Sequence, residues 1–425
     1  MLERETTLQR RLESIVGSEN VGSGTACRID GLVPELLVRP ASSDETAACL
    51  MVCGEAEAAV APAGAMTWLE SGNPLRRANV LLCLDRMCRV VDYSPADLTA
   101  TVEAGLSIKT LNEVARRERQ WLPLNPPGYD RASLGAVAAC ASSGYLRFGF
   151  GSPRDYVIGL RLAHADGSQS KSGGKVVKNV AGYDMNKLYV GSFGTLAVLT
   201  ELTLKLRPYP ESIATAVIAG DSISEMFDAA RRIMASDLRP VSVLLTNVVT
   251  PSLCEVNTGS WLLLIRFADD ASSVAHQMRR IQAVARAGES VAREEDDLLW
   301  TEIGDAHQTE ANVVRMSSPV SSVESLVDRA LEVMPRSSVQ ADVGAGSVRV
   351  AFDSEDETAG GIIRGLRTSA EGLGGVLTIE RSDLATRRQI DTWGEVGPTV
   401  TLMRSIKARF DPNAILNPGR FVAGI

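Results

Sequence analysis

Histidine is scarce in this chain, and cysteine does not occur in metal-binding spacings. The only histidines are His164, His276 and His307, and none belongs to an HExxH pair. The seven cysteines are Cys27, Cys49, Cys53, Cys83, Cys88, Cys140 and Cys254. They form no Cys-x-x-Cys pair and lack the four-thiolate spacing of an iron–sulfur cluster. We therefore predict no metal site, buried inert thiols and structural or surface histidines, with His164 on the solvent side of a strand.

The chain also lacks an excess of basic residues and any long apolar run. Its 44 Lys and Arg against 52 Asp and Glu give a formal net charge of −8, which argues against binding to nucleic acid or to an anionic membrane. No stretch is apolar enough to span a bilayer, and the charged residues 1–17 predict a short surface helix rather than a secretory signal. We expect a cytoplasmic protein, or one held at the inner membrane through partner subunits.

The composition is that of a globular protein with more than one packed unit. Hydrophobic residues make up 45% of the chain and charged residues 23%, and 425 residues exceed the size at which one core keeps growing. Strands, helices and glycine loops alternate over residues 1–210, whereas longer amphipathic helices alternate with strands over 211–399. We predict an α+β fold in which residues 400–425 complete the first unit, and the second unit is an antiparallel sheet with helices on one face.

Local patterns predict several element boundaries. A serine is expected to cap a helix at four places, which are Ser42, Ser107, Ser222 and Ser321. Residues 80–84 are expected to form a strand, and Leu202, Leu204 and Leu206 alternate with polar residues as in a half-buried strand.

Two common nucleotide-binding fingerprints are absent. Gly22-x-Gly24 is followed by Cys27 at the third glycine position, and Gly344-x-Gly346 is followed by Arg349. No GxxxxGK[ST] sequence occurs either. The sequence therefore gives little support to dinucleotide binding of the Rossmann type or to nucleotide hydrolysis by a P-loop.

Three loops of small residues remain unexplained by these fingerprints. The first is Pro62, Ala63, Gly64, Ala65, Met66 and Thr67. The second contains Ser133, Leu134 and Gly135 and continues through Ser142 and Gly144. The third contains Gly191, Gly194, Thr195 and Val198, with Gly182 and Asp184 upstream. Because small side chains let main-chain N–H groups approach a phosphate or sugar closely, we predict that these loops bind an anionic ligand.

In their order along the chain, the loops resemble those of the FAD-binding domain of the vanillyl-alcohol-oxidase superfamily, the PCMH-type domain. The likeness is closest to the smaller FAD-binding subunit of bacterial glycolate oxidase, and it returns in the tail at Asn417-Pro418-Gly419. It implies a two-subdomain FAD-binding domain with an α+β cap, with the loop residues named above and Asn417 as FAD-binding residues. Residues 61–73 contain no His or Cys, so non-covalent FAD is expected.

The chain departs from that family at four positions. Ala65, Met66, Ala136 and Ala197 stand where relatives often carry glycine. A Cβ at a position that needs positive φ costs about 1 kcal/mol or more. Whether these replacements weaken FAD binding stays open, because a dinucleotide held by several main-chain N–H groups can lose one or two contacts, each worth about 0.5–1.5 kcal/mol, and still bind.

The resemblance also implies a reaction, the oxidation of a 2-hydroxy acid such as glycolate or D-lactate. Electrons would pass to partners, a second FAD-containing catalytic subunit and an iron–sulfur subunit. The sequence shows no clear catalytic base, and Arg147, Arg381 and Arg387, the conceivable carboxylate clamps, are predicted to be surface charges. The missing substrate machinery favours a role as the partner subunit. A stand-alone dehydrogenase, a non-catalytic assembly subunit and a relative that has lost FAD stay open as alternatives.

Overall fold

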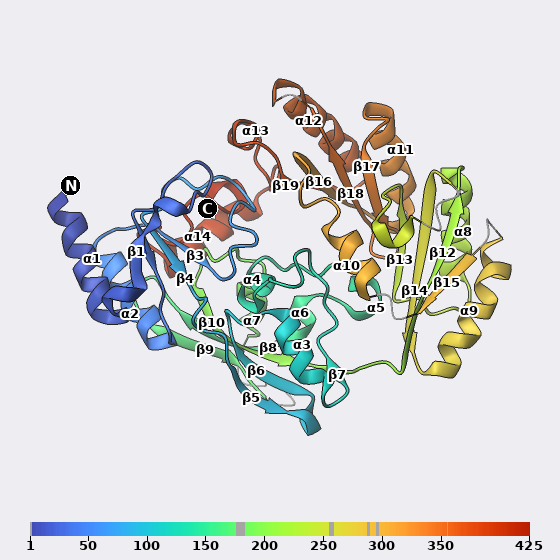
Figure 1. Ribbon diagram of the computed structural model, residues 1–425. Coiled ribbons are helices and arrows are strands. Elements are labelled where there is room, and N and C mark those ends of the chain that lie inside the picture. Colours follow the sequence, from blue (N-terminus) through green and yellow to red (C-terminus); the bar gives the residue numbers. More distant parts are fainter. Residues whose placement is uncertain (1, 176–182, 255–258, 287–289, 295–296, 355) are drawn as a thin grey trace.

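The computed structural model describes residues 2–175, 183–254, 259–286, 290–294, 297–354 and 356–425. Its described residues form three large sheets, two before Arg207 and one after Pro208 (Figure 1). A two-stranded sheet, β7 (Gln120–Trp121) with β11 (Arg207–Pro208), lies between them in the chain. The predicted α+β fold class is confirmed, while the unit boundaries at residues 210 and 399 stay predictions.

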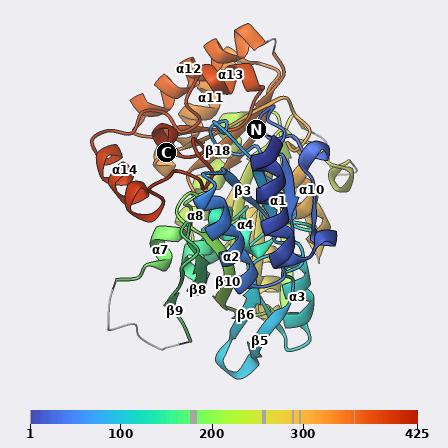
Figure 2. The same cartoon turned by 90° about the vertical axis from the view of Figure 1, so that its left-hand side faces the viewer.

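The first sheet is formed near the start of the chain. Its strands, in spatial order, are β1 (Val21–Ser23), β2 (Leu36–Val38), β4 (Val80–Cys83) and β3 (Val60–Ala63). The first pair is antiparallel and the other two pairs are parallel. Helix α1 (Leu2–Val16) packs on α2 (Ser43–Glu55) and buries Leu8, Leu12 and Val16 (Figure 2).

The C-terminal tail extends this sheet. The backbone N–H of Val60 donates to the carbonyl oxygen of Ile415 at 2.7 Å, and the N–H of Asn417 donates to the carbonyl oxygen of Val60 at 3.0 Å. The tail follows helix α14 (Thr399–Phe410), and Figure 1 shows it beside β3 and β4. Residues 60–67 and 415–420 are therefore neighbours in space.

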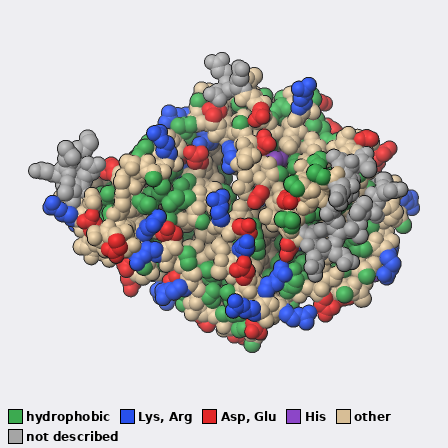
Figure 3. Space-filling model, viewed as in Figure 1, with side chains coloured by type: hydrophobic (Ala, Val, Ile, Leu, Met, Phe, Trp, Pro, Cys, Tyr) green, Lys and Arg blue, Asp and Glu red, His purple; other side chains and the backbone are tan. Residues whose placement is uncertain are grey.

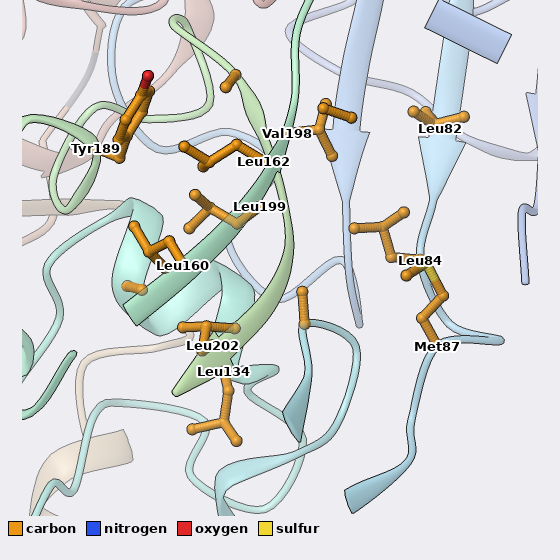
Figure 4. Close-up of a cluster of buried hydrophobic side chains, with 14 of the residues drawn as sticks. Leu82, Leu84, Met87, Leu134, Leu160, Leu162, Tyr189, Val198, Leu199 and Leu202 are labelled. Atoms are coloured by element: carbon orange, nitrogen blue, oxygen red, sulfur yellow. The ribbon is translucent and has the colours of Figure 1, made fainter. Parts of the chain in front are cut away.

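The second sheet is antiparallel and has β10 at its centre. In spatial order its strands are β5 (Val90–Ser94), β6 (Thr99–Glu103), β10 (Val198–Lys205), β8 (Val157–Ala163) and β9 (Gln169–Gly173). Leu202, Leu204 and Leu206 are buried, which confirms the predicted alternation. Leu134 of helix α4 (Leu134–Ala139) points into the same apolar cluster as Leu202 and Leu160 (Figure 4).

Short helices connect the strands of this half. They are α3 (Ile108–Arg116), α5 (Arg147–Phe150), α6 (Pro153–Tyr156) and α7 (Asn186–Tyr189).

The third sheet has eight strands, all paired antiparallel. In spatial order they are β15 (Ser290–Glu294), β12 (Ser212–Gly220), β14 (Trp261–Asp269), β13 (Ser242–Thr246), β17 (Ser338–Asp342), β18 (Ser347–Phe352), β16 (Asn312–Ser317) and β19 (Val376–Arg381). One face packs on helices α8 (Ile223–Ala235), α9 (Ala271–Ala285), α11 (Val323–Val333) and α12 (Asp356–Gly372). This is the predicted sheet with helices on one face.

The opposite face of the third sheet turns toward the first two sheets. Its apolar part packs on helix α10 (Asp297–Asp305) and on Tyr145, with Trp300 fully buried. Its other part carries polar side chains, because Arg315 and Arg349 alternate with residues of the helix-covered core. The structure thus brings a polar sheet face against the half of the molecule that holds the predicted ligand loops.

Three of the four predicted helix caps are confirmed. The side-chain oxygens of Ser42, Ser107 and Ser222 each accept a backbone N–H at the start of α2, α3 and α8. The fourth prediction is wrong, because a 3-10 turn over Val320–Ser322 precedes α11 and places Ser322 at its N-cap.

Several predictions of exposure are also wrong. His164 is buried, and its ring stacks on Phe410 at a centroid distance of 5.9 Å, because α14 covers the end of β8. Cys88 and Cys254 are exposed, whereas Cys49, Cys53 and Cys83 are buried as predicted. Among the helices in the described ranges, none has the length and apolar content needed to cross a membrane.

Candidate functional site

A cleft lies where the first two sheets, α4 and the C-terminal tail meet. It holds about 810 Å³ of space between its atoms, part of it open to solvent. The predicted residues that line it are Pro62, Ala63, Gly64, Met66, Thr67, Ser133, Gly135, Gly194, Val198 and Asn417. The structure therefore brings the three predicted loops and the tail together around one cavity.

The first loop presents free main-chain donors. The backbone N–H groups of Gly64, Ala65, Met66 and Thr67 have no hydrogen-bond acceptor within the described part of the chain. Met66 has φ of 58°, a left-handed conformation. Successive free amides in such a turn are suited to bind an anion such as a diphosphate.

The first and second loops touch at Gly64. A Cβ added there would stand 2.0 Å from Oγ of Ser133. Any residue other than glycine at this position would therefore require the second loop to shift. The Ser133 hydroxyl is buried and has no partner among the described residues, and the same holds for the Thr67 hydroxyl. Because unpaired buried hydroxyls are costly, these two groups fit a ligand that supplies their hydrogen bonds.

The third loop is held by the tail. The side-chain amide of Asn417 donates to the carbonyl oxygen of Phe193 at 2.8 Å, and the ammonium group of Lys407 donates to that of Thr195 at 2.7 Å. Gly194 has φ of 64°, which glycine adopts without strain. The ring of Phe193 packs edge-on against Trp393 at a centroid distance of 4.7 Å. The tail thus fixes the wall of the cleft that this loop forms.

The remaining predicted residues lie around the cleft rather than on its surface. Leu134 is in the apolar core, and Thr195 is buried with its hydroxyl bonded to the carbonyl oxygen of Ser192. Gly144 packs on Asn125, and Asp184 is exposed beside Lys187. Ala65, Ser142 and Gly191 belong to the loops but do not line the cavity. Gly182 lies outside the described residues.

Of the four positions where relatives often carry glycine, only one has the strained backbone conformation that we expected. Met66 has positive φ, whereas Ala65, Ala136 and Ala197 have negative φ and can carry a Cβ without backbone strain. The expected conformational cost is therefore confined to Met66.

A buried ionic group supports the floor of the cleft. The carboxylate of Asp30 lies 2.8 Å from Nη1 of Arg420 and 2.7 Å from Nη1 of Arg387, which is on helix α13 (Leu384–Gln389). Nη2 of Arg387 also lies 4.0 Å from the exposed carboxylate of Glu70, and Arg420 lines the cavity, so this group places a guanidinium at the surface of the cleft. The prediction that Arg387 is a surface charge is wrong, because Asp30 draws its side chain inward.

A second polar group lies on the face of the third sheet opposite helices α8, α9, α11 and α12. We call Tyr145, His307, Arg315, Arg349 and Glu380 the sheet-face cluster. Nε of Arg349 lies 2.6 Å from Oε2 of Glu380, and Nε of Arg315 lies 2.9 Å from Oε1. Nη1 of Arg349 donates to the Tyr145 hydroxyl at 3.0 Å, and that hydroxyl donates to Gln340.

The surroundings of the sheet-face cluster set its charges. Burial raises the pKa of Glu380, but Arg349 and Arg315 outweigh that effect and hold it well below its usual range. Burial and the charge of Arg349 lower the pKa of His307 to about 4, so its imidazole is neutral near neutral pH. The side chains of Arg315 and Glu380 remain 33% and 29% exposed, so solvent reaches the cluster.

The sheet-face cluster is linked to the cleft through Gly128. A Cβ added at Gly128 would stand 2.7 Å from Cγ2 of Thr67, and the Gly128 N–H donates to Oδ1 of Asp305 at 2.7 Å. Asp305 ends α10, two residues before His307. Figure 3 shows acidic and basic side chains mixed along the hollow between the two halves of this face.

The sheet-face cluster was not predicted from the sequence. Arg315 and Arg349 occupy alternate positions in otherwise apolar strands, which is a readable signal for a polar sheet face. Of the arginines that we considered as clamps, Arg147 and Arg381 are exposed and Arg387 is paired with Asp30. Arg381 nevertheless borders the sheet-face cluster, because it follows Glu380 in β19 and donates to the carbonyl oxygen of Gln308.

Two protein-family models match the chain. The FAD binding domain matches residues 34–173, and the C-terminal domain of FAD linked oxidases matches residues 342–421. The chain belongs to the FAD-linked oxidases. The free amides and unpaired hydroxyls of the cleft fit the FAD that this family binds.

Similar proteins in this family act on small hydroxy acids, by their names. D-lactate dehydrogenase [cytochrome] of Arabidopsis thaliana is 28% identical over 92% of this chain and 74% of its own length. Glycolate oxidase subunit GlcD of Bacillus subtilis (strain 168) is 25% identical over 98% of this chain and 97% of its own. Subunit GlcE of Escherichia coli (strain K12) is 40% identical, but over 30% of this chain and 38% of its own length.

Solved structures show the same fold at low identity. A substrate-bound p-cresol methylhydroxylase covers 99% of this chain with a TM-score of 0.75 and 14% identity. An alkyldihydroxyacetonephosphate synthase covers 98% with the same TM-score and identity.

Proposed function

We propose that this FAD-dependent oxidoreductase oxidises a small 2-hydroxy acid, glycolate or D-lactate, at its CH–OH group. The observation that carries the proposal is the junction of two sites, a cleft with free amides and a basic sheet face that Gly128 links to it. The names of the relatives that match almost the whole chain support the same substrate class.

In this proposal the predicted loop residues hold the FAD. The amides of residues 64–67 face its diphosphate, and the hydroxyls of Thr67 and Ser133 receive hydrogen bonds that they lack within the described chain. When bound, FAD would accept a hydride, which is one proton with two electrons, from the substrate. The protein must then place the substrate carboxylate and take up the hydroxyl proton.

The FAD is expected to be non-covalent. Cys140 is the one thiol that lines the cleft among the described residues, and burial raises its pKa to about 12. A protonated thiol is a poor nucleophile, so Cys140 is not suited to attach to the flavin. Acid precipitation of the yellow protein should leave all flavin in the supernatant, and colour in the pellet would contradict non-covalent binding.

Flavin reduction tests the activity. The purified chain, reconstituted with FAD and kept without oxygen, should lose its visible flavin absorbance when D-lactate or glycolate is added. L-Lactate has the same groups in the opposite configuration and serves as the control. A protein that keeps full flavin and is bleached by none of these acids would contradict the proposed function.

A second candidate is the role of an FAD-carrying subunit beside a second, catalytic FAD-containing subunit and an iron–sulfur subunit. The match to GlcE supports it, and the described residues contain no group of three His, Cys, Asp or Glu that could hold a metal ion. Affinity purification from the native host followed by mass spectrometry tests this role. Recovery of the chain without a flavoprotein or an iron–sulfur protein would argue against it.

We also propose how the chain is divided into units and where in the cell the protein is located. We place the FAD-binding part at residues 1–210 and 400–425 with the cap at 211–399, and we expect the protein in the cytoplasm or at the inner membrane through its partners. Limited proteolysis that first cuts near residues 210 and 399 would support the division.

A further inference from the structure

His307 is a buried residue whose two ring nitrogens are unpaired among the described residues. It is 5% exposed, and neither ring nitrogen has a hydrogen-bond partner within the described part of the chain. A neutral imidazole carries one N–H donor and one acceptor nitrogen. Its neighbours in the sheet-face cluster satisfy one another instead, since Arg349, Glu380 and Tyr145 are mutually bonded. A bound molecule is therefore the natural partner of the His307 ring.

The charge beside His307 indicates the chemistry of that molecule. Two guanidiniums, those of Arg315 and Arg349, share the single carboxylate of Glu380. Nη2 of Arg315 has no partner among the described residues, and this side chain is 33% exposed. Asp342 also lies near, but burial raises its pKa to about 7, which reduces its negative charge. The cluster thus has a free cationic donor for an anionic ligand.

We propose that His307 accepts the hydroxyl proton of the 2-hydroxy acid while Arg315, supported by Arg349, binds its carboxylate. This assignment rests on the proposed function. The hydrogen at C2 leaves with its electron pair to bound FAD, the O–H bond breaks with its proton passing to the imidazole, and the C2–O bond becomes a carbonyl. A 2-oxo acid is the product. His307 is then a catalytic residue, and Arg349, which Glu380 and Tyr145 already hold, is a positioning residue.

The position of His307 in the fold agrees with this role. It follows α10 by two residues, and Asp305 at the end of α10 accepts the N–H of Gly128, which packs against Thr67 of the cleft. The sheet-face cluster is therefore connected, through Asp305 and Gly128, to the wall of the cleft that Thr67 forms. The imidazole is neutral near neutral pH and so presents an acceptor nitrogen that has no partner among the described residues.

Two measurements on the FAD-loaded protein test the roles separately. The first is the rate of flavin bleaching by D-lactate or glycolate, and the second is the dissociation constant of oxalate, a dicarboxylate with no hydrogen to lose, by calorimetry. His307→Gln should slow bleaching by about 100-fold or more and leave oxalate binding unchanged. Arg315→Gln should weaken oxalate binding by about tenfold or more.

Matched controls come from helix α9. His276 on α9 is exposed and Arg280 pairs with Asp237 at the surface, so His276→Gln and Arg280→Gln should change neither measurement. His307→Phe replaces the imidazole by a ring that has no nitrogen. It keeps the test valid if the Gln variant does not fold properly. Because the His307 ring makes no hydrogen bond within the described chain, the Phe variant should keep its flavin and its melting temperature.

The outcomes separate this inference from the proposed function. Bleaching at the wild-type rate in flavin-loaded His307→Gln and His307→Phe overturns the proton-acceptor role. Unchanged oxalate binding in Arg315→Gln overturns the carboxylate role. If no 2-hydroxy acid bleaches the wild type, the proposed function fails and the role of His307 falls with it, whereas oxalate binding that depends on Arg315 would still support the anion site.

Discussion

The ammonium group of Lys407 lies 2.7 Å from the carbonyl oxygen of Thr195, although 212 positions separate the two residues. The same group pairs with Asp411 at 2.6 Å and donates to the carbonyl oxygen of Leu416 at 2.9 Å. One buried cation therefore ties α14, the tail and the third loop of the cleft together. The cleft depends on this tie because its walls come from distant parts of the chain.

Replacing Lys407 should loosen the cleft and destabilise the fold. In Lys407→Met the carboxylate of Asp411 stays buried without its cation, which costs about 3–5 kcal/mol. We expect a lower melting temperature and weaker FAD binding, measured by thermal unfolding and by titration of the apoprotein with FAD. Lys109→Met removes an exposed pair with Asp130 and should leave both unchanged. Equal behaviour of the two variants would contradict the role of Lys407.

Replacing Gly64 tests directly whether the first loop of the cleft binds FAD. A Cβ at this position would stand 2.0 Å from Oγ of Ser133, so Gly64→Ala should push the first and second loops apart and lower the flavin content of the purified protein. The Gly64→Ala/Ser133→Gly double variant removes the clash and should regain part of the flavin. At Gly22 a Cβ would meet nothing within 4 Å, so Gly22→Ala is the control. Full flavin in Gly64→Ala would contradict the assignment of this loop.

Patterns within a few residues made much of the cleft predictable. Small residues mark loops that let a ligand approach the backbone, and alternating leucines mark the half-buried strand β10. Both signals are local, and the structure brings Gly64, Ser133 and Gly194 to one cavity. The family resemblance supplied the remaining step, which was to join the three loops and Asn417 into one site.

The burial and the partners of charged side chains could not be predicted from such local patterns. Arg387 looked like a surface charge beside Arg388, but its partner Asp30 is 357 positions away. His307 stands in a polar stretch, and the charges that act on its pKa, Arg349 and Glu380, are on strands that come later in the chain. Whether an ionisable residue faces water or a partner depends on tertiary packing, which no local period encodes.

Asp30 should be essential for stability. It lies between Arg387 and Arg420, and all three side chains are almost completely buried. Asp30→Asn leaves two buried guanidiniums without their shared carboxylate, so we expect a loss of about 3–5 kcal/mol in the free energy of unfolding. Urea denaturation measures it. Asp237→Asn removes an exposed pair with Arg280 and should cost at most about 1 kcal/mol. A similarly small loss in Asp30→Asn would show that the buried group is not needed.

The burial of Asp342 should make the free energy of unfolding decrease as the pH rises. Burial raises its pKa from 3.8 to about 7, so between these values the unfolded chain releases this proton while the folded protein keeps it. The resulting destabilisation is absent below about pH 4 and reaches roughly 4 kcal/mol near pH 7. In Asp342→Asn the amide oxygen can still accept the N–H of Ala345, but there is no proton to lose. The variant should therefore gain stability over the wild type as pH rises from 4 to 7 in urea denaturation, and parallel pH profiles would contradict a buried, protonated Asp342.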